Sequence, residues 1–228
     1  FLQDNEVVPG AAIGIVPKIN GYHAGSEVLR DADIAMYKAK QQGKGVVLFD
    51  KRMRQELVES INLETELREV LTKEGCPGLV LHYQPIVNVI NEQLEGFEAL
   101  VRWDNPLRGL VPPDRFIPLA EETGMIVDLG KWVITESCRQ LKTWQDMVPS
   151  AQSLTVSVNV SGRQFVKPGL VEHIVEVLQY TNLAPSCLKI EVTESVLMHD
   201  LNRMGAELKR LRKIGVQIAI DDFGTGYS

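Results

Sequence analysis

The chain has 228 residues, of which 44% are hydrophobic and 24% are charged, and its formal net charge is −6. This composition is typical of a globular protein and excludes a disordered one. The acidic balance argues against binding to a nucleic-acid polymer, which normally requires a basic patch. No apolar run approaches the roughly 20 residues of a membrane span, and no signal peptide is visible. We therefore expect a cytoplasmic segment without membrane contact of its own, which leaves open a membrane anchor in a longer parent protein.

Residues 1–50 alternate between strand and helix patterns. Residues 11–16 read as a buried strand, a helix begins near Ser26, Gly43 stands where a helix would end, and residues 46–49 read as a second strand. Such a segment is α/β in character but too small for a core of its own. We expect it to be the last part of a larger domain.

Residues 51–74 form a segment of another kind, in which apolar residues recur at helical spacing. Glu64 precedes Arg68 by one helical turn, which favours a helix. We expect a linker helix here. A coiled-coil contact between two copies of the chain is possible, although the repeat is short.

From Leu79 onward, strand and helix patterns alternate. The predicted strands cover residues 79–87, 94–103, 154–160, 188–193 and 217–221. Repeated strand–helix units indicate a largely parallel sheet. Periodicity leaves two architectures open, an open doubly wound sheet and an unfinished (β/α)8 barrel.

Four predicted strands each carry a candidate ligand among the residues on the face opposite their apolar one. The four candidates are Glu98, Asn159, Glu191 and Asp221. Helices should cover the apolar face of each strand, so the polar side chains must share the opposite face. We therefore predict that the four side chains converge.

Three carboxylates and an amide oxygen in one place would repel one another unless a cation lay between them. All-oxygen donors suit Mg²⁺ or Mn²⁺ better than zinc. Asp222, next to Asp221, offers a bridge to a second ion, as in two-metal phosphoester hydrolysis, and Arg102 could bind a phosphate oxygen. The alternatives are that single acids cap helices, that Asp221-Asp222 is a turn, and that Arg102 pairs with Asp104 or another surface acid.

These residues lie in motifs that together resemble the EAL phosphodiesterases. The motifs follow the family's order over residues 79–228 and read Tyr83-Gln-Pro-Ile-Val87, Glu95-Gly-Phe-Glu-Ala-Leu-Val-Arg-Trp103, Ser157-Val-Asn-Val-Ser161, Ile190-Glu-Val-Thr-Glu-Ser195 and Asp221-Asp-Phe-Gly-Thr-Gly-Tyr-Ser228. The resemblance implies a TIM-barrel-like fold, of which about five of the eight strands fall within this chain. It also implies hydrolysis of cyclic di-GMP to linear pGpG with Mg²⁺ or Mn²⁺.

The resemblance further assigns roles to individual residues. Glu98, Asn159, Glu191 and Asp221 match metal ligands, and Asp222 lies beside the second metal. Gln84, Leu100 and Arg102 match substrate contacts. Glu194 matches a glutamate that supports the loop and the metal region. Glu98, Asp221, Asp222 and Glu194 are therefore the candidate catalytic residues.

The early segment resembles the closing part of a GGDEF domain, a domain that makes cyclic di-GMP from GTP. The matching stretches are Ala12-Ile-Gly-Ile-Val16, Leu29-Arg-Asp-Ala-Asp-Ile-Ala-Met-Tyr-Lys-Ala-Lys40 and Gly43-Lys-Gly45. The signature of that family is not among these residues, so we expect no catalysis here. The expected organisation is a GGDEF fragment at 1–50, a linker helix at 51–74 and the first part of an EAL domain at 75–228.

The resemblance also implies three further barrel strands beyond Ser228, with additional catalytic residues. We therefore expect the 228 residues alone to be weakly active at best. Two other functions remain open: a catalytically inactive receptor for cyclic di-GMP, and a signalling scaffold in which the early segment and the linker helix form a homodimer.

Overall fold

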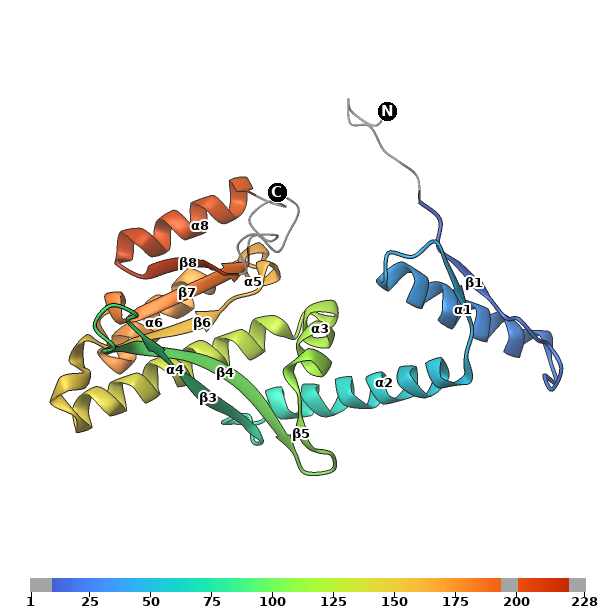
Figure 1. Ribbon diagram of the computed structural model, residues 1–228, viewed down its shortest axis with the longest axis horizontal. Coiled ribbons are helices and arrows are strands. Elements are labelled where there is room, and N and C mark those ends of the chain that lie inside the picture. Colours follow the sequence, from blue (N-terminus) through green and yellow to red (C-terminus); the bar gives the residue numbers. More distant parts are fainter. Residues whose placement is uncertain (1–9, 194–200, 222–228) are drawn as a thin grey trace. The chain divides into compact units, whose positions relative to one another are not determined.

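The computed structural model describes residues 10–193 and 201–221, and of residues 201–203 it describes the backbone only (Figure 1). The chain divides into two compact units, Phe1–Thr65 and Glu66–Ser228. The boundary falls within the helix α2 (Lys51–Thr72), which occupies the segment predicted as a linker helix. None of the helices in the described ranges is long and apolar enough to cross a bilayer.

The first unit contains the strand–helix–strand unit that the sequence predicts, but its first strand is not buried as predicted, since Ile13 and Ile15 are 48% and 41% exposed. Strands β1 (Ile13–Ile15) and β2 (Val46–Leu48) pair in parallel, and α1 (Gly25–Gln41) connects them. Gly14 is required where α1 crosses β1, because a Cβ atom there would lie 2.0 Å from the Ala32 carbonyl oxygen. These elements are consistent with the GGDEF resemblance, which nevertheless stays a prediction.

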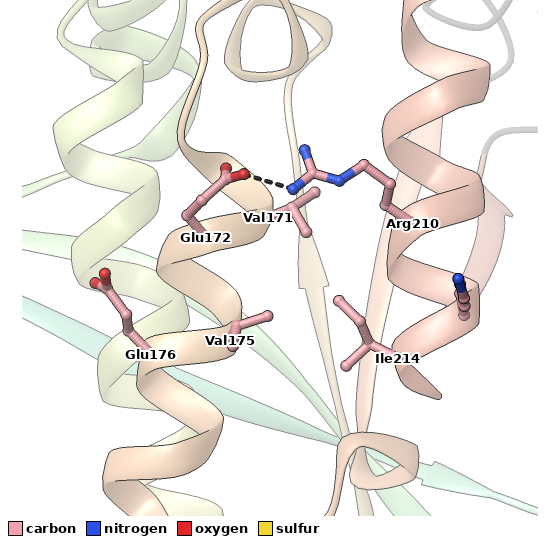
Figure 2. A pocket seen from close by; sticks show the side chains of 7 residues that line it. Val171, Glu172, Val175, Glu176, Arg210 and Ile214 are labelled. Carbon is pink, nitrogen blue, oxygen red and sulfur yellow. Dashed lines mark hydrogen bonds and ion pairs between the residues drawn. The ribbon is translucent and has the colours of Figure 1, made fainter.

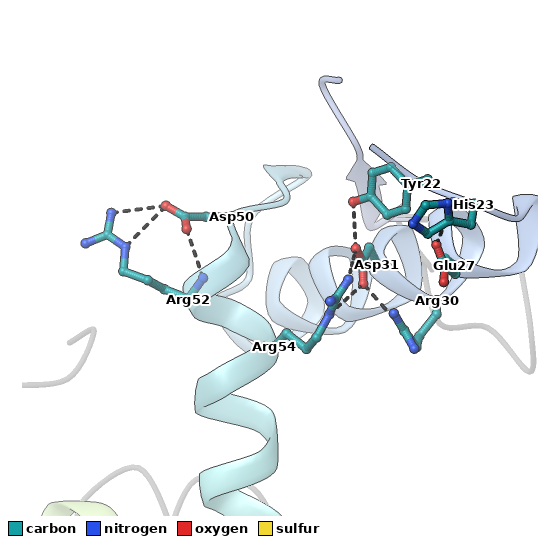
Figure 3. Close-up of polar contacts among 8 residues, drawn as sticks. All are labelled: Tyr22, His23, Glu27, Arg30, Asp31, Asp50, Arg52 and Arg54. Atoms are coloured by element: carbon teal, nitrogen blue, oxygen red, sulfur yellow. Dashed lines mark hydrogen bonds and ion pairs between the residues drawn. The ribbon is translucent and has the colours of Figure 1, made fainter. Parts of the chain in front are cut away.

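A buried carboxylate joins α1 to the start of α2 within the first unit (Figure 3). Asp31 has no exposed surface; it accepts hydrogen bonds from Tyr22 Oη at 2.6 Å and from Arg54 Nε at 3.2 Å. Burial raises the pKa of Asp31, but the hydrogen bonds from Tyr22 and Arg54 outweigh it, and the net pKa is lowered. The ionised form is therefore stabilised in the fold, and this stabilisation is lost as the pH falls through the folded-state pKa.

The second unit is built on one sheet with the order β3-β4-β6-β7-β8. The strands span Leu79–Val87, Leu94–Asn105, Thr155–Asn159, Leu188–Thr193 and Gln217–Asp221. Strands β4, β6, β7 and β8 are parallel, as the sequence predicts, whereas β3 is antiparallel to β4. A short strand that the sequence did not predict, β5 (Gly109–Val111), pairs with the end of β4.

Helices pack along the apolar side of this sheet (Figure 1). They are α3 (Pro113–Thr123), α4 (Ile126–Met147), α5 (Gly162–Val166), α6 (Leu170–Thr181) and α8 (Leu201–Ile214), with short 3₁₀ helices at Pro149–Ser153 and Pro185–Cys187. Val156, Val158 and Ile190 have no exposed surface, and Trp144 of α4 contacts the rings of Tyr83 and Phe97. The core therefore lies on this side of the sheet and leaves the other face to polar residues.

The C-terminal end of α2 is fastened to the β4–β5 hairpin within the second unit. Glu66 accepts a hydrogen bond from Asn105 Nδ2 at 2.7 Å and pairs with Arg108 Nε at 2.9 Å. The hydrogen bond from Arg108 is the largest influence on Glu66 and lowers the pKa of its carboxyl group. Cys76, Cys138 and Cys187 are buried free thiols.

Candidate active site

The strand register brings the predicted polar residues to neighbouring positions. Glu98 of β4 pairs with Ser157 of β6, and Asn159 pairs with Glu191 of β7. Asp221, the last residue of β8, pairs with Thr193 at the end of β7. Because the four strands are parallel, their carboxyl ends lie at one edge of the sheet. The polar residues therefore share one face near this edge.

A direct hydrogen bond joins two of these residues. Asn159 Nδ2 donates to Glu98 Oε1 at 2.7 Å, across the two strands. The Asn159 side chain is exposed and Glu98 is half-buried, so the pair stands at the solvent end of the polar face. An amide beside a carboxylate supplies a hydrogen-bond donor but no positive charge, so this contact does not neutralise a carboxylate.

The pKa of Glu191 responds to the neighbouring carboxylates. Its pKa is raised, first because the half-buried side chain loses solvation, and further because Glu98 and Asp221 carry like charges nearby. The Ser157 hydroxyl partly opposes this rise in pKa, although it forms no hydrogen bond of ordinary geometry. Glu98, Glu191 and Asp221 are thus close enough to repel one another, which is the electrostatic condition for binding a cation.

The carboxylates are near neighbours without forming a closed metal site. Among the described residues, no three His, Cys, Asp or Glu side chains lie close enough together to hold a metal ion. Glu194 and Asp222, two of the residues predicted from the sequence, lie outside the described ranges. The oxygen donors that are described, and the repulsion that raises the pKa of Glu191, fit a hard divalent cation.

The predicted substrate contacts lie on the two strands beside the carboxylates. Gln84 of β3 is exposed and pairs with Glu98, and Leu100 and Arg102 are half-buried on β4. Arg102 Nη1 donates to the backbone carbonyl of Val101 at 2.8 Å. Arg102 is therefore available to a ligand at this face, provided that the contact with Val101 is exchanged.

The loop after β6 contains a feature that the sequence reasoning missed. Ser161 is the N-cap of α5 and forms a capping box with Gln164, whose side chain accepts a hydrogen bond from the Ser161 N–H at 3.0 Å. A serine followed three residues later by glutamine is the sequence signal of this cap. Ser161 follows Asn159 by two residues in the chain.

A separate groove lies between α6 and α8 (Figure 2). Its volume is about 510 Å³, and the Glu172–Arg210 ion pair at 2.5 Å spans its two sides above Val171, Val175 and Ile214. None of the candidate site residues that the structure describes lines it. The groove is therefore distinct from the polar face of the sheet.

Comparison with known proteins connects the polar face to a family. A family model described as the EAL domain matches residues 64–228. MucR of Pseudomonas aeruginosa, a bifunctional diguanylate cyclase/cyclic di-GMP phosphodiesterase, is 42% identical over 228 residues, which cover 100% of this chain and 33% of that protein. The cyclic di-GMP phosphodiesterase PdeR of Escherichia coli is 38% identical over 224 residues, covering 98% of this chain and 33% of PdeR.

A solved structure agrees with these relatives. The phosphodiesterase PaMucR in complex with c-di-GMP superposes with a TM-score of 0.67 at 45% sequence identity, over 73% of this chain and 66% of that chain. The chain spans about a third of the length of the two curated relatives. The resemblance seen in the sequence motifs is confirmed: the chain belongs to the EAL domain family.

Proposed function

We propose that the domain containing residues 64–228 is a cyclic di-GMP phosphodiesterase that hydrolyses its substrate to linear pGpG. The observation that carries the proposal is the polar face of the parallel strands, where Asn159 contacts Glu98 at 2.7 Å and like charges raise the pKa of Glu191. Relatives named cyclic di-GMP phosphodiesterases match nearly the whole chain, and a related solved structure is a c-di-GMP complex, which supports this substrate.

In this proposal, Glu98, Asn159, Glu191 and Asp221 hold one divalent ion, and Asp222 helps to hold a second. Oxygen donors of this kind favour Mg²⁺ or Mn²⁺. Two bound metal ions would supply an activated water and neutralise the negative charge of the phosphate. The charges of the three carboxylates then become favourable, because each has a cation to face.

The neighbouring strands position the substrate. Arg102 can give up its contact with the Val101 carbonyl and donate to a phosphate oxygen instead, a stronger charge-assisted bond. Gln84, exposed on β3 opposite Glu98, presents an amide to the polar part of the nucleotide, and Leu100 offers an apolar contact. We assign Glu194 the supporting role for the loop and metal region that the family resemblance implies.

We also propose the finer organisation of the chain. The sheet of the second unit is part of a TIM-barrel-like fold, which agrees with its parallel strands β4, β6, β7 and β8. Residues 1–50 belong to a GGDEF domain, 51–74 to a linker helix and 75–228 to the EAL domain. The match of MucR, named as a bifunctional diguanylate cyclase/phosphodiesterase, over the whole chain supports this assignment. Homodimerisation through the first two segments stays a prediction.

The proposal is tested by incubating the protein that contains this chain with cyclic di-GMP and Mg²⁺ or Mn²⁺, with products separated by chromatography. We expect linear pGpG from the wild type and a loss of rate of about a thousandfold in Glu98→Ala, because a ligand of the reacting site is removed. Glu95→Ala is the matched control on the same strand; Glu95 is exposed and accepts a hydrogen bond from Asn88 at 2.6 Å. Saturable nucleotide binding by the wild type without pGpG would contradict the proposal and indicate a receptor.

A further inference from the structure

Glu121, in the last turn of α3, contacts the loop that leaves the carboxyl end of β6. The Ser161 hydroxyl donates a hydrogen bond to Glu121 Oε1 at 2.5 Å. This distance is typical of a charge-assisted O–H···O⁻ bond, which is stronger than a neutral one. The same hydroxyl accepts from the Arg163 N–H at 3.4 Å, as the N-cap of α5. Through its side chain, Glu121 therefore holds Ser161, the N-cap residue of α5.

A second hydrogen bond joins Glu121 to α5, this time through Arg163. Arg163 Nη1 donates to the backbone carbonyl oxygen of Glu121 at 2.8 Å. Carbonyl groups at the end of a helix lack an intrahelical partner and carry partial negative charge, so a guanidinium is favourable there. The end of α3 and the start of α5 are thus joined by two hydrogen bonds, one to the Glu121 carboxylate and one to the Glu121 backbone carbonyl oxygen.

The capping residue Gln164 also packs tightly against Gly130 of α4. Gln164, which completes the capping box, is 3% exposed, and a Cβ atom on Gly130 would lie 1.9 Å from Gln164 Nε2. On the other side of the loop, the Val160 N–H donates to the Glu191 carbonyl oxygen at 2.9 Å. The backbone on the C-terminal side of Asn159 is therefore held from β7, α3 and α4.

Asn159 itself has little to hold it. Its side chain is exposed, and within the described part of the chain it makes one hydrogen bond, to Glu98 at 2.7 Å. A side chain in this position keeps its direction through the backbone that carries it. Ligand orientation by residues that do not touch the ion is a general property of metal sites.

We propose that Glu121 is a positioning residue for Asn159, acting through Ser161 and the start of α5. In the described part of the chain, Glu121 hydrogen-bonds to Ser161 and Arg163 and not to a candidate ligand, and its contact with Ser161 fixes the backbone from which the Asn159 amide projects. The inference deepens the proposed function and rests on it for its kinetic consequences. The ordering of the loop by Glu121 does not depend on turnover.

The test compares Glu121→Ala, Glu121→Gln and Ser161→Ala with the wild type in the protein that contains this chain. For Glu121→Ala we expect kcat for cyclic di-GMP and Mn²⁺ affinity, measured by electron paramagnetic resonance, each to fall about tenfold, with KM nearly unchanged. Glu121→Gln retains an acceptor oxygen and should recover most of both losses. Amide hydrogen exchange of residues 160–164 should be faster in Glu121→Ala and close to wild type in Glu121→Gln.

Ser161→Ala removes the other half of the same contact. The double variant Glu121→Ala/Ser161→Ala should therefore be no worse than Ser161→Ala alone, which already lacks both this contact and the cap to the Arg163 N–H, because residues that share one contact are not additive. Glu176→Ala, an exposed glutamate on α6, is the matched control and should leave kcat and loop exchange unchanged. Wild-type kcat and exchange in Glu121→Ala would overturn the inference. A wild type without turnover would refute the proposed function instead. The positioning role of Glu121 would then be tested by the Mn²⁺ affinity and the amide exchange of residues 160–164, compared between Glu121→Ala and the wild type.

Discussion

Glu191→Gln is expected to lower cyclic di-GMP hydrolysis by about a thousandfold while raising the thermal stability of the metal-free protein. The loss of activity follows from removing a charged oxygen donor that the proposed ions require. The gain in stability follows from the environment of Glu191, where burial and the like charges of Glu98 and Asp221 raise the pKa. Glutamine has nearly the same shape and carries no charge, so it removes the repulsion without leaving a cavity.

The pH dependence of this gain has a definite sign. A carboxyl group whose pKa is higher in the folded than in the unfolded state destabilises the fold wherever it is ionised. That destabilisation is complete above the folded-state pKa and disappears as the pH falls below the unfolded value of about 4.3. The stability difference between Glu191→Gln and the wild type should therefore be largest at neutral and alkaline pH and should close toward pH 4.

Thermal unfolding in the presence of a chelator, followed by circular dichroism from pH 4 to pH 8, measures this difference. Glu74→Gln is the control, because Glu74 is an exposed glutamate in the loop before β3. A Glu191→Gln protein that is less stable than the wild type at pH 8 would contradict the electrostatic account. Retention of hydrolysis in that variant would contradict the proposed role of Glu191.

Gly96→Ala is expected to destabilise the second unit by about 3 kcal/mol. Gly96 is buried in β4, where a Cβ atom would lie 2.3 Å from the Thr155 carbonyl oxygen and 2.4 Å from Thr155 Oγ1. The carbonyl belongs to the backbone of β6 and cannot move aside without opening the β4–β6 pairing. Hydrolysis should fall as well, since Glu98 and Ser157 pair in the same ladder.

Urea unfolding of the variant and the wild type gives this change in the free energy of unfolding. The matched control is Gly205→Ala in the interior of α8, where a Cβ atom meets nothing within 4 Å. That substitution should be neutral or stabilise by up to about 1 kcal/mol, because alanine favours a helix more than glycine does. An unchanged unfolding midpoint in Gly96→Ala would show that β4 and β6 are not packed as closely as described.

The sheet of the second unit was largely predictable because its strands alternate strictly between apolar and polar residues. The segments 188–193 and 217–221 match β7 and β8 residue for residue. The alternation also placed Glu98, Asn159 and Glu191 on the polar face. It could not reveal that β3 is antiparallel, since strand direction depends on the connection and not on the face pattern.

Features that depend on neighbours distant in the chain were missed. The contact between Glu121 and Ser161 joins residues 40 positions apart, and neither residue shows in its own sequence surroundings that it has this partner. The short strand β5 was not predicted, because its three residues, Gly109–Val111, are too few to show an alternation of apolar and polar side chains. The capping box of Ser161 and Gln164 does have a local signal, a serine followed three residues later by a glutamine, and could have been predicted from the sequence.

The most direct test of the central claim is a Mn²⁺ titration of cyclic di-GMP hydrolysis, after the protein that contains this chain has been treated with a chelator. The proposed site predicts no linear pGpG without added metal and a saturable return of activity with Mn²⁺ in the wild type. Glu98→Ala should require a higher Mn²⁺ concentration or remain inactive. Turnover that persists at full rate after chelation would contradict a metal-dependent site built on Glu98, Asn159, Glu191 and Asp221.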